Sequence, residues 1–172
     1  HLFNFYIGVG LVSALMNDGN IVYGAVDMEG AAGQMIIDVE GVPHRFAKGN
    51  AGALESYITI PVLEHRLRKE LKLMERSTYL NKPIEEVDFS HLVFALRKSD
   101  PLAIKLFEQA AVYLGIGIAN WLNILHPEKV ILGGPLLQAH ELVFATAKKT
   151  ALDRVYYYPV YDVSFNKGKF GD

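Results

Sequence analysis

Short apolar runs separated by glycine-rich turns dominate the first forty residues. The first run alternates apolar and polar positions and carries aromatic residues, which is typical of a β-strand. Asn17-Asp18-Gly19-Asn20 separates the second run from the third, and Asp-Gly between apolar runs is a strong hairpin signal. We therefore predict strands at residues Leu2–Gly8, Val12–Met16, Ile21–Tyr23 and Met35–Val39.

From Ala53 onward the apolar spacing becomes that of α-helices, and Pro61 predicts a kink or a break in the first of them. Ser99-Asp100-Pro101 has a cap residue followed by proline, which marks a helix start. The following helix is apolar on almost every side, and its Gly115 and Gly117 indicate close packing against another backbone. We expect helices from Ala53 and over Asn81–Lys98, Leu102–Leu125 and Leu136–Leu152, with strands at Val130–Leu132 and Tyr161–Phe165.

Three early strands followed by alternating helices and strands predict an α/β domain with a mixed sheet. The chain has 172 residues, 51% of them hydrophobic and 21% charged, which suits one globular domain. A net charge of -2 provides no broad attraction to nucleic acid or to an anionic membrane. The chain contains no cysteine, no run of about 18 apolar residues and no signal-peptide pattern. We therefore expect a cytoplasmic protein without membrane contact, disulfides or a thiolate metal site.

Two glycine pairs are candidates for phosphate binding. Gly8 and Gly10 follow the first strand, and Gly133 and Gly134 follow the buried strand at 130–132. Glycines allow backbone amides to approach a phosphate, and the carboxyl ends of strands are common ligand sites in α/β sheets. The alternative for both pairs is a tight turn that needs glycine for conformational reasons.

No catalytic residue and no metal ligand can be assigned from local motifs. The histidines show no metal-ligand spacing, and no Gly-x-Ser-x-Gly motif marks a serine nucleophile.

Taken in order, these segments resemble the ROK family (repressors, open reading frames, sugar kinases), which has an actin-like, ribonuclease-H-like sugar-kinase fold. "IGVGLVSALMNDGNIVYGA" is similar to the family's phosphate hairpin, and "GAVDMEGAAGQMIID" to its sugar-binding loop. "GNAGALESY" is similar to the end of its zinc knuckle, and "DPLAIKLFEQAAVYLGIGIANWLNILHPEKVILGGPL" to the following helix and strand. The resemblance implies that residues 1–172 form the carboxyl-terminal half of such a fold, a mixed sheet flanked by helices. It also implies a fragment that lacks the upstream half and the last helix.

The departures from the family are concentrated in the ligand motifs. Its sugar-gripping Glu-x-Gly-His reads Ala31-Ala32-Gly33-Gln34 here, and its three knuckle cysteines correspond to Phe46, Lys48 and Ala53. A two-residue shift would place His44 at the first cysteine position instead. The resemblance therefore implies a lost zinc site, a loop stabilised by burial of Phe46 and Ala53, and sugar contacts reduced to Glu55, Gln34 and Gly33. Glu55 has the alternative role of a first-turn helix carboxylate.

These features are closest in character to ROK-type regulators of sugar metabolism, so we expect the sugar-sensing and dimerisation domain of a transcriptional regulator. A small sugar would be the effector, the chain would form a homodimer, and DNA would be contacted only through an amino-terminal domain outside this sequence. One alternative is a ROK sugar kinase for a hexose or amino sugar, which would use ATP and magnesium. A second alternative is a non-catalytic homologue that binds a partner.

Overall fold

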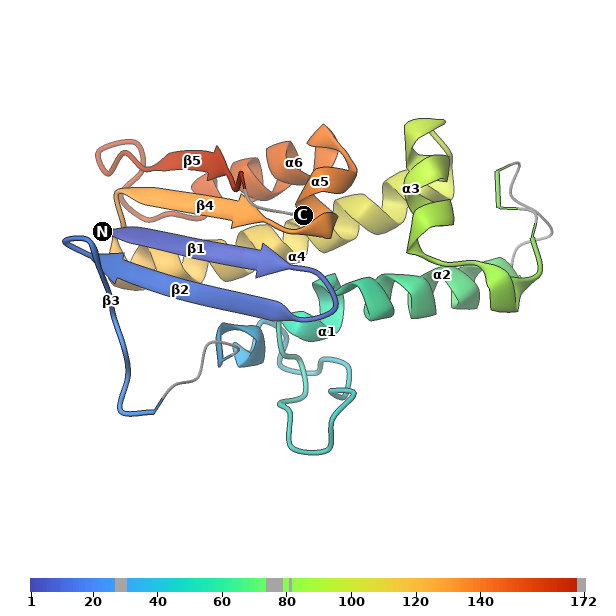
Figure 1. The fold of residues 1–172 in the computed structure, drawn as a ribbon, viewed down its shortest axis with the longest axis horizontal. Helices are drawn as coiled ribbons and strands as arrows, with labels where there is room; N and C mark the ends of the chain where they lie inside the picture. The colour runs from blue at the N-terminus through green and yellow to red at the C-terminus, as the bar shows by residue number, and fades with distance from the viewer. Residues whose placement is uncertain (27–30, 74–78, 81, 170–172) are drawn as a thin grey trace.

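The computed structural model describes residues 1–26, 31–73, 79–80 and 82–169. Within them five strands form one sheet in the order β3-β2-β1-β4-β5 (Figure 1). Strand β2 runs antiparallel to its neighbours β1 and β3, whereas β1, β4 and β5 run parallel. The predicted mixed sheet is therefore confirmed. Its strands are β1 (Leu2–Ile7), β2 (Leu11–Asn17), β3 (Asn20–Ile21), β4 (Lys129–Gly133) and β5 (Ser164–Lys167).

One face of the sheet forms the core. Phe3, Phe5 and Ile7 alternate along β1 and are buried, and Phe3 and Phe5 pair with Val130 and Leu132 on β4. These residues lie on the same side because side chains alternate between the faces of a sheet. Helices α4 (Pro101–Leu125) and α6 (Glu141–Leu152) lie behind the sheet in Figure 1, along this face.

Helix α4 is the central helix of the core, as its apolar composition predicts. The Asp100 carboxylate caps it by accepting hydrogen bonds from the Leu102 and Ala103 amides, and His126 ends it in the left-handed conformation. A Cβ at Gly115 would lie 2.7 Å from the Ala147 carbonyl oxygen of α6, so the two backbones are in close contact. By length and composition α4 could cross a membrane. Twelve of its residues are buried within the domain, however, which is the pattern of a core helix.

The helices before α4 differ from the prediction in extent. The segment from Ala53 is divided at Thr59 into α1 (Glu55–Ile58) and α2 (Ile60–Leu73), so the predicted break near Pro61 is confirmed. A single helix over Asn81–Lys98 is wrong: a 3₁₀ turn, η2 (Ile84–Glu86), precedes α3 (Phe89–Arg97), and Asn81 lies outside the described residues. The new start has a local cause, because the Asp88 carboxylate and the His91 ring form a capping box at the first turn of α3.

Three further predictions need correction. The helix at 136–152 is interrupted at His140, where extended backbone separates α5 (Pro135–Ala139) from α6, and the His140 ring accepts the Leu142 amide as a new cap. Met35–Val39 is not a strand. It follows a 3₁₀ turn, η1 (Ala31–Gln34), and contributes only an isolated bridge between Ile36 and Ala53. The last strand begins at Ser164 instead of Tyr161, because the preceding residues form turns.

Candidate functional site

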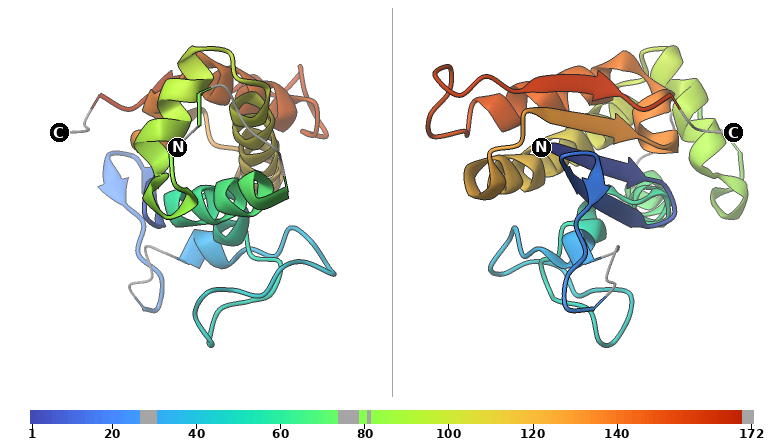
Figure 2. Two further views of the ribbon diagram at one scale, coloured as in Figure 1. Left: turned by 90° about the vertical axis from the view of Figure 1, so that its right-hand side faces the viewer. Right: turned by 60° about the vertical axis from the view of Figure 1, so that its left-hand side comes forward.

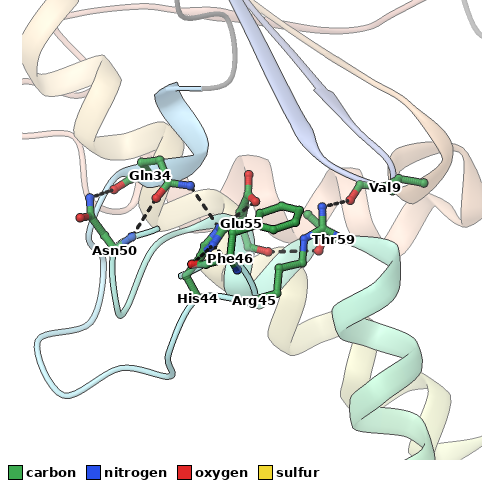
Figure 3. Close-up of polar contacts among 8 residues, drawn as sticks. All are labelled: Val9, Gln34, His44, Arg45, Phe46, Asn50, Glu55 and Thr59. Atoms are coloured by element: carbon green, nitrogen blue, oxygen red, sulfur yellow. Dashed lines mark hydrogen bonds and ion pairs between the residues drawn. The ribbon is translucent and has the colours of Figure 1, made fainter. Parts of the chain in front are cut away.

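Three polar side chains meet below the sheet, at the junction of η1, the loop before α1, and α1 itself (Figure 3). His44 Nε2 lies 2.8 Å from Glu55 Oε1 and 3.1 Å from Gln34 Nε2. A Cβ at Gly33 would lie 2.6 Å from Glu55 Oε2, so only glycine leaves room for this carboxylate. The fold thus brings together all three sugar-binding candidates, Gln34, Gly33 and Glu55.

Hydrogen bonds and burial hold the two candidate side chains, Gln34 and Glu55, in place. The Gln34 side-chain carbonyl accepts the Asn50 amide at 2.9 Å, and Asn50 Nδ2 donates to the Gln34 backbone carbonyl at 2.9 Å. These contacts direct the amino group of Gln34 toward His44. Glu55 is the first residue of α1, and its side chain is only 12% exposed and paired with His44. Neither side chain is therefore a freely moving surface group.

His44 is the residue that the sequence analysis did not assign to the site. Its side chain is 2% exposed, although the flanking loop residues are exposed. The Phe46 amide donates to Nδ1 at 3.0 Å, and in the tautomer that accepts this bond Nε2 carries the proton and donates to Glu55. The signal in the sequence was its place in a glycine-rich loop, which we considered only as a shifted zinc ligand.

A cavity of about 1100 Å³ opens beside this cluster, between the loop at 42–45, α1, α2 and α4. Tyr57 and Tyr113 line it with their rings 4.2 Å apart. The Tyr57 hydroxyl accepts the Val42 amide and donates to Asp38 Oδ2, and burial raises the pKa of this hydroxyl. Desolvation lowers the pKa of Arg66, whose Nη1 is buried without a partner among the described residues. The wall therefore combines aromatic surface with hydrogen-bonding groups, as small-molecule sites do.

The four candidate phosphate glycines lie at one end of the sheet, since β1 and β4 are parallel and Tyr6 pairs with Gly133. The Gly8 amide is already bonded to the Gly10 carbonyl at 2.9 Å. Gly134 has φ +93°, and a Cβ there would lie 2.4 Å from the Ile7 carbonyl oxygen. Pro135, which has no N–H, follows it and begins a helix of only five residues. At Gly8 and Gly134 these contacts favour turn and packing roles over phosphate binding.

Two hydrogen bonds connect the glycine turn to the His44 cluster. Arg45 Nη2 donates to the Val9 carbonyl at 3.1 Å, and the Ile60 amide donates to the Gly8 carbonyl at 2.9 Å. Arg45 directly follows His44 in the chain, and Ile60 lies five residues after Glu55. The two candidate sites are therefore parts of one connected region (Figure 3).

The loop does not have the interior that the sequence analysis predicted. Ala53 is buried as expected, but Phe46 is 60% exposed and its predicted role as an apolar plug is wrong. The Arg45 guanidinium lies 4.6 Å from the centre of the Phe46 ring and covers it instead. The interior position belongs to His44, whose ring lies where any Cβ at Gly49 would clash, 2.1 Å from Cγ.

The residues at the expected zinc-ligand positions do not fit zinc. Structural zinc sites use four nitrogen or sulfur ligands, and Phe46 and Ala53 have no donor side chain. The remaining cysteine position is the exposed Lys48, and Gln34 replaces the histidine. In the part of the chain that the structure describes, no three His, Cys, Asp or Glu side chains are grouped to hold a metal ion.

Two known proteins are similar to this chain over most of its length. The xylose repressor of Caldicellulosiruptor bescii is 24% identical over 167 residues, which cover 96% of this chain and 41% of the repressor. The glucokinase of Thermotoga maritima is 24% identical over 157 residues, which cover 90% of this chain and 49% of the kinase. This chain thus spans less than half the length of either relative.

A solved structure shows the same fold. The crystal structure of a ROK family transcriptional regulator, a homologue of the E. coli MLC protein, superposes with a TM-score of 0.85 at 26% identity, covering 99% of this chain and 42% of that one. The expected half of an actin-like sugar-kinase fold is therefore confirmed. Because the ROK family model matches residues 1–172, this chain is a member of the ROK family.

Proposed function

We propose that this chain is the sugar-sensing and dimerisation part of a ROK-family transcriptional regulator. The observation that carries the proposal is the cluster of Gln34, His44 and Glu55 beside an open cavity. Two comparisons support the proposal: a solved structure with the same fold is a transcriptional regulator, and a relative in sequence is a xylose repressor. Contact with DNA would come from a part of the longer protein outside these 172 residues.

The cluster has the groups that bind a sugar hydroxyl. A hydroxyl donates one hydrogen bond and accepts others. Gln34 Nε2 can donate to it. His44 Nε2 cannot accept the Gln34 proton, because this nitrogen already carries a proton and donates it to Glu55. Glu55 Oε2 can accept from it, since no described residue bonds this oxygen. A polyhydroxyl ligand would thus complete the hydrogen bonding of the cluster.

A ROK sugar kinase is the alternative, and the relationship to a glucokinase supports it. Phosphoryl transfer depends on positioning and charge stabilisation around the phosphates. In the described chain, the Gly8 amide is used internally and Pro135 removes another amide from the second turn. These losses favour a protein that binds sugar without transferring phosphate. The partner-binding homologue remains the reading if no sugar binds.

The test uses the full-length protein that carries this chain. Calorimetric titration with D-xylose and with D-glucose measures binding, and a coupled assay with ATP and magnesium measures sugar-dependent ATP turnover. We expect binding of one of the two sugars and no sugar-dependent turnover. Glu55→Gln should weaken that binding roughly 10- to 100-fold, since it removes a charged hydrogen-bond acceptor.

Glu85→Gln is the matched control, because Glu85 is an exposed carboxylate on η2 that does not line the cavity. Its sugar affinity should stay within about twofold of the unchanged protein. Turnover of ATP that requires the sugar would replace the regulator proposal with the kinase. A complete lack of sugar binding would favour the partner-binding homologue.

A further inference from the structure

The loop between residues 42 and 53 is closed by side chains that come from outside it. Glu55 Oε1 and Gln34 Nε2 both approach one nitrogen of the His44 ring, at 2.8 Å and 3.1 Å from Nε2. The Tyr57 hydroxyl holds the Val42 amide at 3.1 Å, at the start of the loop. At its other end, the Gly52 amide donates to the Val42 carbonyl at 2.9 Å. His44 is thus the internal anchor of a loop that is also tied at both ends.

The fit around His44 is steric as well as polar. A Cβ at Gly49 would lie 2.1 Å from both Cγ and Nδ1 of the ring, so the Gly49 backbone packs directly on it. The Phe46 amide bonds Nδ1 from the same side. The ring therefore contacts the loop backbone through one edge and the Glu55 carboxylate of α1 through the other. A structural metal ion connects a loop to a neighbouring helix in the same way, by binding groups from both.

We propose that His44 takes the place of the family's zinc, as the centre of a metal-free clasp made of the His44 ring and the Glu55 carboxylate, with the Gln34 amide beside it. In this clasp His44 is a positioning residue: its Nε2–H fixes the orientation of the Glu55 carboxylate while its ring holds the loop closed. The role of the clasp in closing the loop does not depend on the proposed sugar-sensing function. Its role in orienting Glu55 toward a sugar rests on that proposed function.

The clasp has a consequence for ligand binding. Glu55 Oε1 is engaged by His44, which leaves Oε2 toward Gly33 as the acceptor for a ligand. Without His44 the Glu55 carboxylate would lose the donor that fixes its orientation. Loss of His44 should therefore open the loop and weaken sugar binding together, whereas loss of an ordinary surface histidine should do neither.

The first measurement concerns metal and loop closure in the full-length protein. Elemental analysis should find far less than one zinc per chain, and EDTA should leave the melting temperature unchanged. Arg45 and Lys48 are exposed trypsin sites within the loop, so the cleavage rate there reports its opening. His44→Ala should raise that rate about tenfold or more, because cleavage follows the population of the open form.

Two variants separate positioning from general damage. His44→Gln retains an N–H donor near the place of Nε2 and should restore slow cleavage in part, even if His44→Ala folds poorly. His65→Ala is the control for cleavage, since His65 is an exposed histidine on α2, outside the loop. It should be cleaved as slowly as the unchanged protein.

The two proposals fail in different ways. About one zinc per chain, a melting temperature lowered by EDTA, or unchanged cleavage in both His44 variants would overturn the clasp. Absence of D-xylose and D-glucose binding in the unchanged protein would overturn the sugar-sensing function, while zinc content and cleavage would still decide the clasp. Where a sugar binds, His44→Ala should reduce its affinity about tenfold, and His44→Gln should recover most of it.

Discussion

Two glycines that look alike in the sequence have different physical roles. Gly134 has a positive φ and packs on the Ile7 backbone, whereas a Cβ at Gly10 would meet nothing within 4 Å. Both were candidate phosphate ligands because each follows a strand. The sequence could not separate them, since the constraint on Gly134 comes from a strand more than 120 residues away.

We expect Gly134→Ala to lower the free energy of unfolding by about 2 kcal/mol or more, because it combines an unfavourable φ with a clash against immovable backbone. Gly10→Ala should change it by no more than about 0.5 kcal/mol. Urea denaturation of both variants measures the difference. Equal stability of the two would show that neighbouring backbone moves freely at residue 134.

At the scale of elements, the two glycines of α4 should also differ. A Cβ at Gly115 would lie 2.7 Å from the Ala147 backbone oxygen on α6, but at Gly117 the nearest atoms belong to the Leu54 side chain, at 2.5 Å. Alanine improves helix propensity by about 1 kcal/mol at either position. Only at Gly115 must a whole helix shift to accept it.

Gly115→Ala should therefore destabilise the protein by about 1–3 kcal/mol, and Gly117→Ala by clearly less. Thermal unfolding followed by circular dichroism compares them. A larger loss for Gly117→Ala would mean that Leu54 is held more rigidly than the α4–α6 contact.

The sequence predicted elements well where the signal was local and poorly where it was not. The Asp18-Gly19 hairpin and the Asp100 cap depend on neighbouring residues, and both are confirmed. Met35–Val39 has the composition of a strand, but Val39 is 96% exposed and the Ile37 amide bonds Gly52 in the loop instead. A strand needs a neighbouring strand with which to pair. The sequence of these five residues does not show that such a neighbour is absent.

The candidate site was predictable in part for the same reason. Gln34, Gly33 and Glu55 could be named from the family resemblance, and the fold places them together. His44 could not be assigned, because a buried position in a polar loop depends on where Gly49 and Glu55 lie in space. Phe46 was misjudged in the same way: aromatic character favours burial, but His44 already fills the interior.

For the whole molecule, two exposed apolar side chains lie where the carboxyl end of α4 meets the turns before β5. They are Tyr156, which is 84% exposed, and Ile124, which is 68% exposed, and we call them the apolar patch. The patch is fixed to α4, because the Tyr156 amide donates to Asn123 Oδ1 and Asn123 Nδ2 donates to the Arg154 carbonyl. Exposed aromatic patches of this kind are typical of subunit contacts.

We expect this patch to form the homodimer contact. In sedimentation experiments the full-length protein should be dimeric, and Tyr156→Ser combined with Ile124→Ser should raise the dimer dissociation constant about 100-fold. Val39→Ser, which changes an exposed apolar residue elsewhere, is the control. A dimer unaffected by the double substitution would place the contact on another surface.

The packing of α4 has a mechanical consequence. Gly117 contacts Leu54, the residue before Glu55. Six residues further along the same helix, Asn123 accepts a hydrogen bond from Tyr156 of the apolar patch. That separation is about 9 Å of helix, and a helix buried on most sides moves as a stiff rod. A displacement of α1 on ligand binding would be transmitted along this rod to the patch, so subunit geometry and effector occupancy would be connected through less than two turns of backbone.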